Sequence, residues 1–142
     1  DRNYKSPIHA DKESVDRDYD KAVEFCVDNY QTVGSCNASH NLESNKLQAE
    51  LIDERSIVKN HPHLNFCQLY GMSDNITFNL ANKGYNVAKY LPYGPVKEVM
   101  PYLIRRAREN TSITGDVSRE MSHLSQEMKR RGMKGPFDLN LT

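Results

Sequence analysis

The chain has 142 residues, of which 19 are basic and 19 are acidic, so its formal net charge is zero. Nucleic-acid binders usually carry a clear excess of Lys and Arg, and the balance therefore argues against that class. No apolar run approaches the roughly 18–20 residues of a membrane-spanning helix, so we expect a soluble chain. Residues 1–7 contain neither an apolar segment nor an initiator Met, and we expect the chain to be cut from a longer protein.

Cysteine usage is sparse. The cysteines Cys26, Cys36 and Cys67 form no Cys-x-x-Cys pair, a spacing typical of neither a structural zinc site nor a disulfide framework. We expect three free thiols in a reducing compartment, and therefore a protein that is not secreted. His61 and His63 lie close in sequence without a nearby carboxylate or cysteine, so we expect no metal site.

The first half of the chain alternates helical and strand patterns. Apolar residues at steps of three and four predict a helix over 13–30. The short stretch 32–37 is rich in small residues and predicts a strand, and residues 64–70 predict a second strand. Between the two strands we expect a helix whose apolar members are Leu47, Ala49, Leu51, Ile52 and Ile57.

The pattern then repeats. Ser73 is a typical capping residue for a helix that runs through Ala81 and ends at Gly84. Residues 85–91 predict a third strand. A turn rich in proline and glycine closes this strand.

The last third of the chain is predicted to be helical. A helix over 95–109 begins with a proline, which suits a first turn because the N–H it lacks would be unpaired there, and Pro101 is expected to bend it. A further helix over 117–131 ends at Gly132, and its basic residues are expected to form a surface cover. The tail 133–142 shows no periodicity.

Strand and helix alternate three times after the opening helix, an order that implies a parallel sheet with crossover helices. Three strands leave sheet edges exposed, and no Gly-x-Gly-x-x-Gly turn supports a dinucleotide-binding fold. We therefore predict an α/β fold that is the C-terminal portion of a (βα)8 barrel, about its last three strands and their helices. Barrel active sites lie at the strand C-termini. Three groups of residues fall at such ends: Ser39, His40 and Asn41, then Gln68, Leu69 and Tyr70, and finally Tyr90.

The stretch 102–110 carries the strongest chemical signal. Two adjacent guanidiniums offer planar donor forks that suit a carboxylate or a phosphate. A glutamate one turn later can brace either of them. The spacing alone leaves a solvated basic face as the alternative. Four residues share one face of this helix: Tyr102, Arg105, Arg106 and Glu109.

Two runs of the chain closely resemble the C-terminal signature of the proline dehydrogenase family. They are Tyr-Leu-Pro-Tyr-Gly-Pro-Val at 90–96 and Tyr-Leu-Ile-Arg-Arg-Ala-Arg-Glu-Asn at 102–110. The resemblance covers most of the chain, from Pro7 to about Arg131. Supporting matches in the family's order are Pro7-Ile8, Asp16, Tyr19, Ala-Ser-His-Asn at 38–41 and Gln-Leu-Tyr-Gly-Met at 68–72.

The resemblance implies an FAD-dependent, distorted (βα)8 barrel that oxidises L-proline to pyrroline-5-carboxylate and passes electrons to a membrane quinone. In such an enzyme Arg105 and Arg106 would clamp the substrate carboxylate. Tyr102 and Leu69 would wall the proline ring, and Tyr90 would pack against its far carbons. The residues expected along the FAD or in its region are Ser39, His40, Asn41, Gln68 and Glu109, the last of which would also orient the arginines.

The family's catalytic members are longer than this chain. We therefore expect residues 1–132 to form the C-terminal part of the barrel, 133–142 to be a loose tail, and the N-terminal remainder of the barrel to be a required partner. The resemblance also implies the matrix side of the mitochondrial inner membrane in a eukaryote. In a bacterium it implies the cytoplasm or a peripheral association with the inner membrane.

Two alternatives stay open. Hydroxyproline dehydrogenases carry a small residue at the position of Tyr90, which makes room for the hydroxyl group, so the tyrosine favours proline. The other alternative is a non-catalytic α/β fragment that binds a partner chain, with the face of Arg105 and Arg106 as a docking patch.

Overall fold

A computed structural model of the chain describes residues 8–110, 122 and 125–132, with the backbone alone for residues 107–110. The chain divides into two compact units, Asp1–Leu91 and Pro92–Thr142. The predicted tail and the beginning of the predicted last helix, at 117–121, lie outside the described residues.

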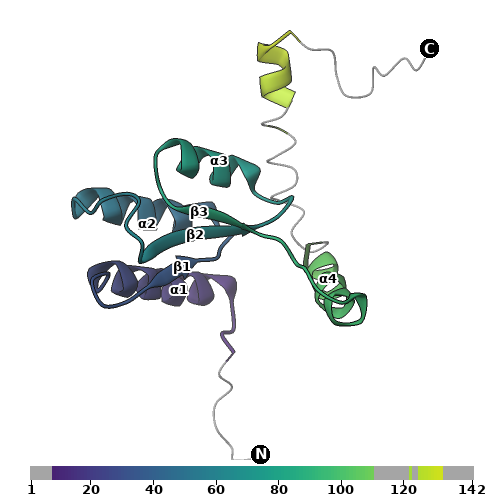
Figure 1. Cartoon of the computed structure of the whole chain (residues 1–142), viewed down its shortest axis with the longest axis horizontal. Coiled ribbons are helices and arrows are strands. Elements are labelled where there is room, and N and C mark those ends of the chain that lie inside the picture. The colour runs from purple at the N-terminus through teal and green to yellow at the C-terminus, as the bar shows by residue number, and fades with distance from the viewer. Residues whose placement is uncertain (1–7, 111–121, 123–124, 133–142) are drawn as a thin grey trace, which may run out of the picture. The chain divides into compact units, whose positions relative to one another are not determined.

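The first unit is a parallel sheet whose strands are connected by helices (Figure 1). The strands lie in the order β1-β2-β3, and both neighbouring pairs are parallel. This confirms the predicted α/β class with crossover helices. The elements of this unit are α1 (Lys12–Asp28), β1 (Ser35–Asn37), α2 (Leu42–Glu54), β2 (Leu64–Leu69), α3 (Asp74–Asn82) and β3 (Val87–Tyr90).

One face of the sheet is covered by helices and holds the core. Side chains of β2 alternate between the two faces, and Leu64 and Phe66 are fully buried on the covered one. The Phe66 ring meets the Tyr85 ring edge-on, with centroids 5.6 Å apart. Burying each large apolar side chain contributes about 1.5–3 kcal/mol. The core is completed by Val27 of α1, Leu51 and Ile52 of α2, Ile57, and Ile76 and Leu80 of α3.

The opposite face of the sheet is open in the described residues. On β2 the alternate positions Asn65, Cys67 and Leu69 are only partly buried. Cys36 of β1 is exposed on the same face, as are Ala88 and Tyr90 of β3. We refer to this side, which carries Cys36, Cys67, Leu69 and Tyr90, as the open face.

The ends of α2 and α3 each differ from the prediction in one detail. Ile57 was expected on the second helix, but Ser56 has a φ of 52° and turns the chain back, so that Ile57 donates its N–H to the Ile52 carbonyl and enters the core. Ser73 was expected to cap α3. It stands at the cap position with a φ of 51°, and its side chain makes no capping hydrogen bond.

The second unit contains α4 (Val96–Asn110), which includes Pro101 and begins one residue later than the helix predicted over 95–109. The Pro95 carbonyl accepts the N–H groups of Glu98 and Val99, so Pro95 precedes the first turn. Residues 125–130 are also helical, and Gly132, with a φ of 67°, ends that segment as predicted. Among the described residues, no helix combines the length and apolar character needed to cross a membrane.

Candidate functional site

The sheet brings six of the predicted site residues to one edge, because the carboxyl ends of parallel strands lie together. The loop after β1 supplies three, and the last residues of β2 and β3 supply the others. We call this group the strand-end cluster: Ser39, His40, Asn41, Gln68, Leu69 and Tyr90.

His40 joins the end of β1 to the end of β2. Its Nε2 accepts the backbone N–H of Leu69 at 3.4 Å, and its Nδ1 lies 2.8 Å from the Ser73 hydroxyl oxygen. Because Nε2 is the acceptor, the hydrogen-bond pattern assigns the ring proton to Nδ1, which donates to Ser73. The imidazole is therefore held in one tautomer and one orientation by the chain's own groups.

The buried side chain of Asn45 holds the loop that contains Ser39 and Asn41. Asn45 Nδ2 donates to the Ser39 carbonyl at 3.0 Å and to the Asn41 carbonyl at 2.7 Å. The Asn41 Oδ1 accepts the Glu43 N–H and so caps α2. Within the described part of the chain the Asn41 Nδ2 makes no hydrogen bond, which leaves its two N–H donors available to a ligand.

Gln68 lies on the covered face and is 1% exposed. Its Nε2 donates to the Ser39 carbonyl at 3.2 Å and to Asn45 Oδ1 at 3.3 Å, and its Oε1 accepts the Thr77 hydroxyl at 2.9 Å. Gln68 thus holds the loop after β1 against α3. Its predicted direct contact with FAD stays a prediction.

Leu69 and Tyr90 stand next to each other on the open face. They are register partners on β2 and β3, so their backbones run about 4.8 Å apart. The Tyr70 N–H donates to the Tyr90 carbonyl at 2.9 Å and closes the pairing. The Tyr90 side chain is 49% exposed. The two residues predicted to contact the proline ring from the strands therefore share one surface.

The other four predicted residues lie on α4 in the second unit. The Arg106 guanidinium carbon stands 5.4 Å from the centre of the Tyr102 ring, one helical turn away, a cation–π arrangement. Tyr102 and Arg106 are partly buried and Arg105 is exposed. Glu109 lies on the same helix, and its side chain is outside the described residues. The predicted helical face is thus present, with Tyr102 and Arg106 in direct contact along it.

Sequence reasoning missed three residues that hold the strand-end cluster in place: Ser73, Asn45 and Lys89. Ser73 was assigned to a helix cap, whereas its hydroxyl contacts His40. Lys89 was treated as an ordinary strand residue. Lys89 lies opposite Gln68, and the other strand positions on the covered face are uncharged. Its charge was therefore a sequence signal that could have indicated a special role.

Two further hydrogen bonds, both through Asn37, connect β1 to α1 and α2. The Tyr19 hydroxyl of α1 donates to Asn37 Oδ1 at 2.7 Å, and Asn37 Nδ2 donates to the Ser44 carbonyl of α2 at 3.2 Å. A tyrosine hydroxyl is protonated at neutral pH and serves here as the donor, and burial raises the pKa of Tyr19 further above its ordinary value.

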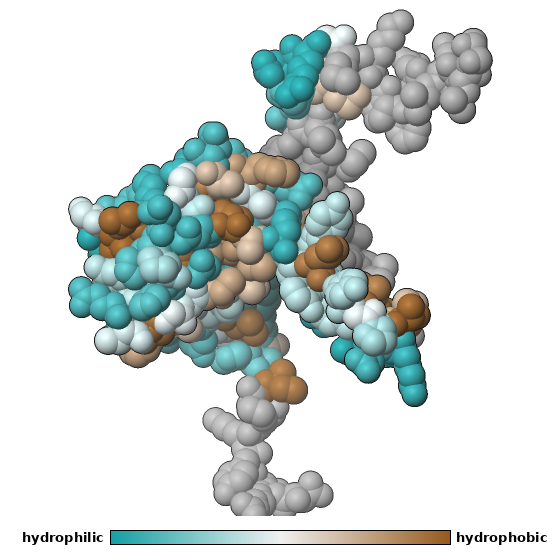
Figure 2. Space-filling model, viewed as in Figure 1, coloured by the Kyte–Doolittle hydropathy of each residue, from teal (hydrophilic) through white to brown (hydrophobic). Residues whose placement is uncertain are grey.

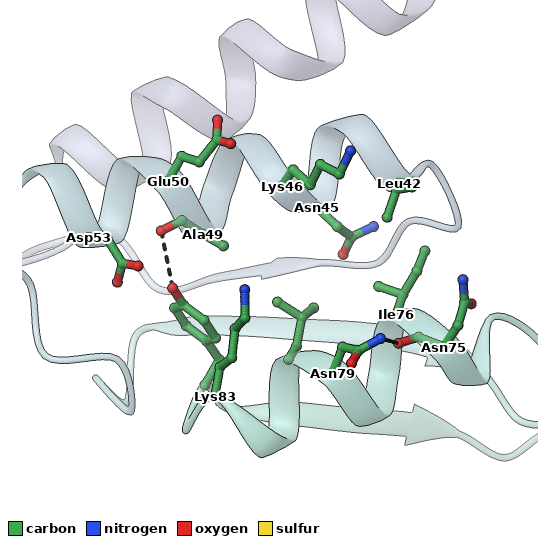
Figure 3. A pocket seen from close by; sticks show the side chains of 12 residues that line it. Leu42, Asn45, Lys46, Ala49, Glu50, Asp53, Asn75, Ile76, Asn79 and Lys83 are labelled. Atoms are coloured by element: carbon green, nitrogen blue, oxygen red, sulfur yellow. Dashed lines mark hydrogen bonds between the residues drawn. The ribbon is translucent and has the colours of Figure 1, made fainter. Parts of the chain in front are cut away.

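A groove of about 330 Å³ runs between α2 and α3, on the helical side of the first unit (Figure 3). Its lining includes the apolar residues Leu42, Ile76 and Leu80 and charged residues such as Lys46 and Lys83. Apolar residues also show between the polar surfaces of the two helices in Figure 2. The groove contains none of the predicted site residues. In the described part of the chain, no three His, Cys, Asp or Glu side chains gather as a metal site would require.

The family model for proline dehydrogenase matches residues 1–119. The chain belongs to the proline dehydrogenase family. It is 41% identical to proline dehydrogenase 2, mitochondrial, of Arabidopsis thaliana over 92% of its length, and 37% identical to proline dehydrogenase 1, mitochondrial, of Caenorhabditis elegans over 94%. It is also 39% identical over 92% of its length to the hydroxyproline dehydrogenase of Xenopus laevis.

The chain spans 28%, 23% and 29%, respectively, of these three family members. A crystal structure of proline utilization A (PutA) from Bdellovibrio bacteriovorus, inactivated by N-propargylglycine, matches 80% of the chain with a TM-score of 0.69 and 29% identity. The match takes up 12% of that chain. As a proline dehydrogenase family member, this chain therefore corresponds to a segment of its longer relatives.

Proposed function

We propose that the protein to which this chain contributes oxidises L-proline to pyrroline-5-carboxylate, with FAD as cofactor and a quinone as the final electron acceptor. The chain supplies the last three strands of a (βα)8 barrel, and its open face is turned toward the barrel interior. The observation that carries the proposal is the register pairing of Leu69 with Tyr90 on that face, beside His40, in a chain of this family.

The residues of the strand-end cluster suit a flavin. FAD presents carbonyl, hydroxyl and phosphate oxygens, which accept hydrogen bonds, and among the described residues the two N–H donors of the Asn41 amide have no acceptor. Asn41 would donate to the cofactor from the loop after β1, Ser39 and His40 would lie along it, and Glu109 would contribute from α4. When bound, FAD supplies the acceptor for a hydride from the ring carbon next to the proline nitrogen.

The side chains of this protein bind and orient the substrate. L-proline is a zwitterion with one carboxylate, and Arg105 and Arg106 provide adjacent guanidinium forks for it. The contact of Arg106 with the Tyr102 ring restrains the guanidinium before substrate arrives. Leu69 and Tyr90 pack against the proline ring and exclude water from it. This packing holds the reacting carbon in position.

The arginine pair offers the direct test of this proposal. In the complete, flavin-loaded protein, Arg105→Met or Arg106→Met should raise the KM for L-proline by about 100-fold, because a charge-assisted carboxylate contact is lost. Arg130→Met is the matched control, since Arg130 pairs with Glu127 at 2.5 Å on the segment at 125–132. An unchanged KM in the Arg105 and Arg106 variants would contradict the proposal.

Hydroxyproline oxidation is the second candidate, favoured by the 39% identity to a relative named hydroxyproline dehydrogenase. The bulky Tyr90 on the open face argues for proline. Tyr90→Ser should shift the ratio of kcat/KM toward hydroxyproline. If the unaltered protein already prefers hydroxyproline, the second candidate is correct.

The location we propose is the mitochondrion in a eukaryotic source, because both named proline dehydrogenases compared above are mitochondrial proteins. We further propose a peripheral association with the matrix side of the inner membrane, because the proposed quinone acceptor is a membrane component. Fractionation followed by a carbonate wash tests this proposal, since a peripheral protein is released from the membrane by the wash.

A further inference from the structure

Lys89 is a charged residue on the helix-covered face of the sheet. It is the register partner of Gln68, and its side chain is 20% exposed. The preceding residue on the same face of β3, Val87, is apolar and packs against the core. An ammonium placed there is unfavourable unless it is paired and hydrogen-bonded.

In the described part of the chain, the acceptors of the Lys89 ammonium come from the end of β2, the turn that follows it and the start of α3. Nζ donates to the Leu69 carbonyl at 3.4 Å and to the Met72 carbonyl, and it lies 2.7 Å from Asp74 Oδ1. An ammonium has three N–H donors, and these three acceptors match them. Lys89 thereby ties β3 to the whole turn from 69 to 74.

The same turn carries the groups that orient His40. The Leu69 N–H donates to His40 Nε2, and the Ser73 hydroxyl lies against Nδ1. Ser73 has a φ of 51°, which is uncommon for a residue other than glycine and persists only when its surroundings enforce it. Lys89 contacts Met72 and Asp74, which lie on either side of Ser73, and these contacts hold Ser73 in this backbone conformation.

We propose that Lys89 is a positioning residue of the proline site. Its ammonium fixes the turn 69–74, and the turn fixes the Leu69 side chain on the open face and the His40 ring. Lys89 lies on the opposite face of the sheet from Leu69 and Tyr90, so it acts through the turn. The inference rests on the proposed function, and it concerns the ring-binding half of the site.

The test compares a ligand that has a ring with one that has none. In the complete, flavin-loaded protein, dissociation constants for tetrahydrofuran-2-carboxylate and for acetate are measured by the change in flavin absorbance. Lys89→Met should raise both the dissociation constant of tetrahydrofuran-2-carboxylate and the KM for L-proline about tenfold, because the Leu69 side chain that contacts the ring shifts. Acetate, which needs the arginines alone, should change less than twofold. Lys46→Met is the control, since Lys46 is exposed and pairs with Glu43 on the surface of α2.

Two results would overturn the role of Lys89: no change for either ligand, or an equal change for both with a lower melting temperature. If Lys89→Met does not retain flavin, Asp74→Asn replaces it, because that variant keeps the two carbonyl contacts of the ammonium. It should give a smaller effect that is still selective for the ring, and an unselective effect would overturn the inference. Failure of the unaltered protein to oxidise L-proline contradicts the proposed function instead.

Discussion

The two faces of the sheet are built for different tasks, although their residues alternate along the same strands. On β2, Phe66 and Gln68 face the helices and are almost completely buried, whereas Cys67 and Leu69 face the open side. The covered face has a packed apolar centre and a saturated polar end. Stability therefore resides on one face, and the contacts proposed between the strands and the proline ring, from Leu69 and Tyr90, reside on the other.

The largest expected effect is at the centre of the covered face. Phe66→Ala should lower the free energy of unfolding by about 3–5 kcal/mol, because Phe66 is fully buried against Tyr85 and leaves a cavity when truncated. Urea unfolding of the variant measures the loss. Phe78→Ala on the exposed side of α3 is the control, since Phe78 is 66% exposed.

The next effect concerns the polar end of that face. Gln68→Leu should cost about 1–3 kcal/mol, because the Ser39 carbonyl and the Thr77 hydroxyl lose a buried partner. The change should also weaken flavin retention, since the Ser39 loop is released. Exposed Gln31 provides the control as Gln31→Leu. A Gln68 variant with unaltered stability would show that the amide network is dispensable.

A substitution on the open face should affect substrate binding more than stability. Leu69→Ala should cost no more than about 1 kcal/mol of stability, because Leu69 is only partly buried. In the complete protein the same change should raise the KM for L-proline. Urea unfolding measures the free energy of unfolding, and steady-state kinetics measures the KM, so the two effects are separated. A large loss of stability with an unchanged KM would reverse the assignment of the two faces.

The smallest effect is a shift in thiol reactivity on the open face. Partial desolvation and the neighbouring Cys67 thiol raise the pKa of Cys36, so its thiolate forms only at higher pH than in an ordinary cysteine. The rate of alkylation by iodoacetamide should therefore rise at a higher pH than for a cysteine peptide, and Cys67→Ser should lower that midpoint. A midpoint at or below the peptide's would contradict this environment for Cys36.

Periodicity predicted the elements of this fold well, because the helix and strand patterns are local. The alternation along β2 also implied two faces. It could not show that Gln68 and Leu69, adjacent in one motif, serve opposite faces, since that depends on which side α2 and α3 cover. Ile57 was placed on a helix because the left-handed residue Ser56 has no distinctive local pattern.

Sequence analysis named candidate residues for the site, but it could not identify the groups that hold them in place. The spacing of Tyr102 and Arg106 predicted a shared helical face, because a helix brings residues four apart together. That the Arg106 guanidinium lies over the Tyr102 ring is a finding of the structure. The acceptors of Lys89 are backbone carbonyls and a carboxylate from a distant turn, which side-chain patterns do not encode. The roles of Asn45 and Ser73 depend on long-range packing for the same reason.

The central claim is that this chain completes a flavin-dependent proline site. An anaerobic titration of the complete protein with L-proline, followed by absorbance at roughly 450 nm where oxidised flavins absorb, tests it most directly. We predict that the band is present and bleaches on adding L-proline, and that the chain without the remainder of its barrel is colourless. A protein that binds flavin but whose band L-proline leaves unchanged would contradict the account.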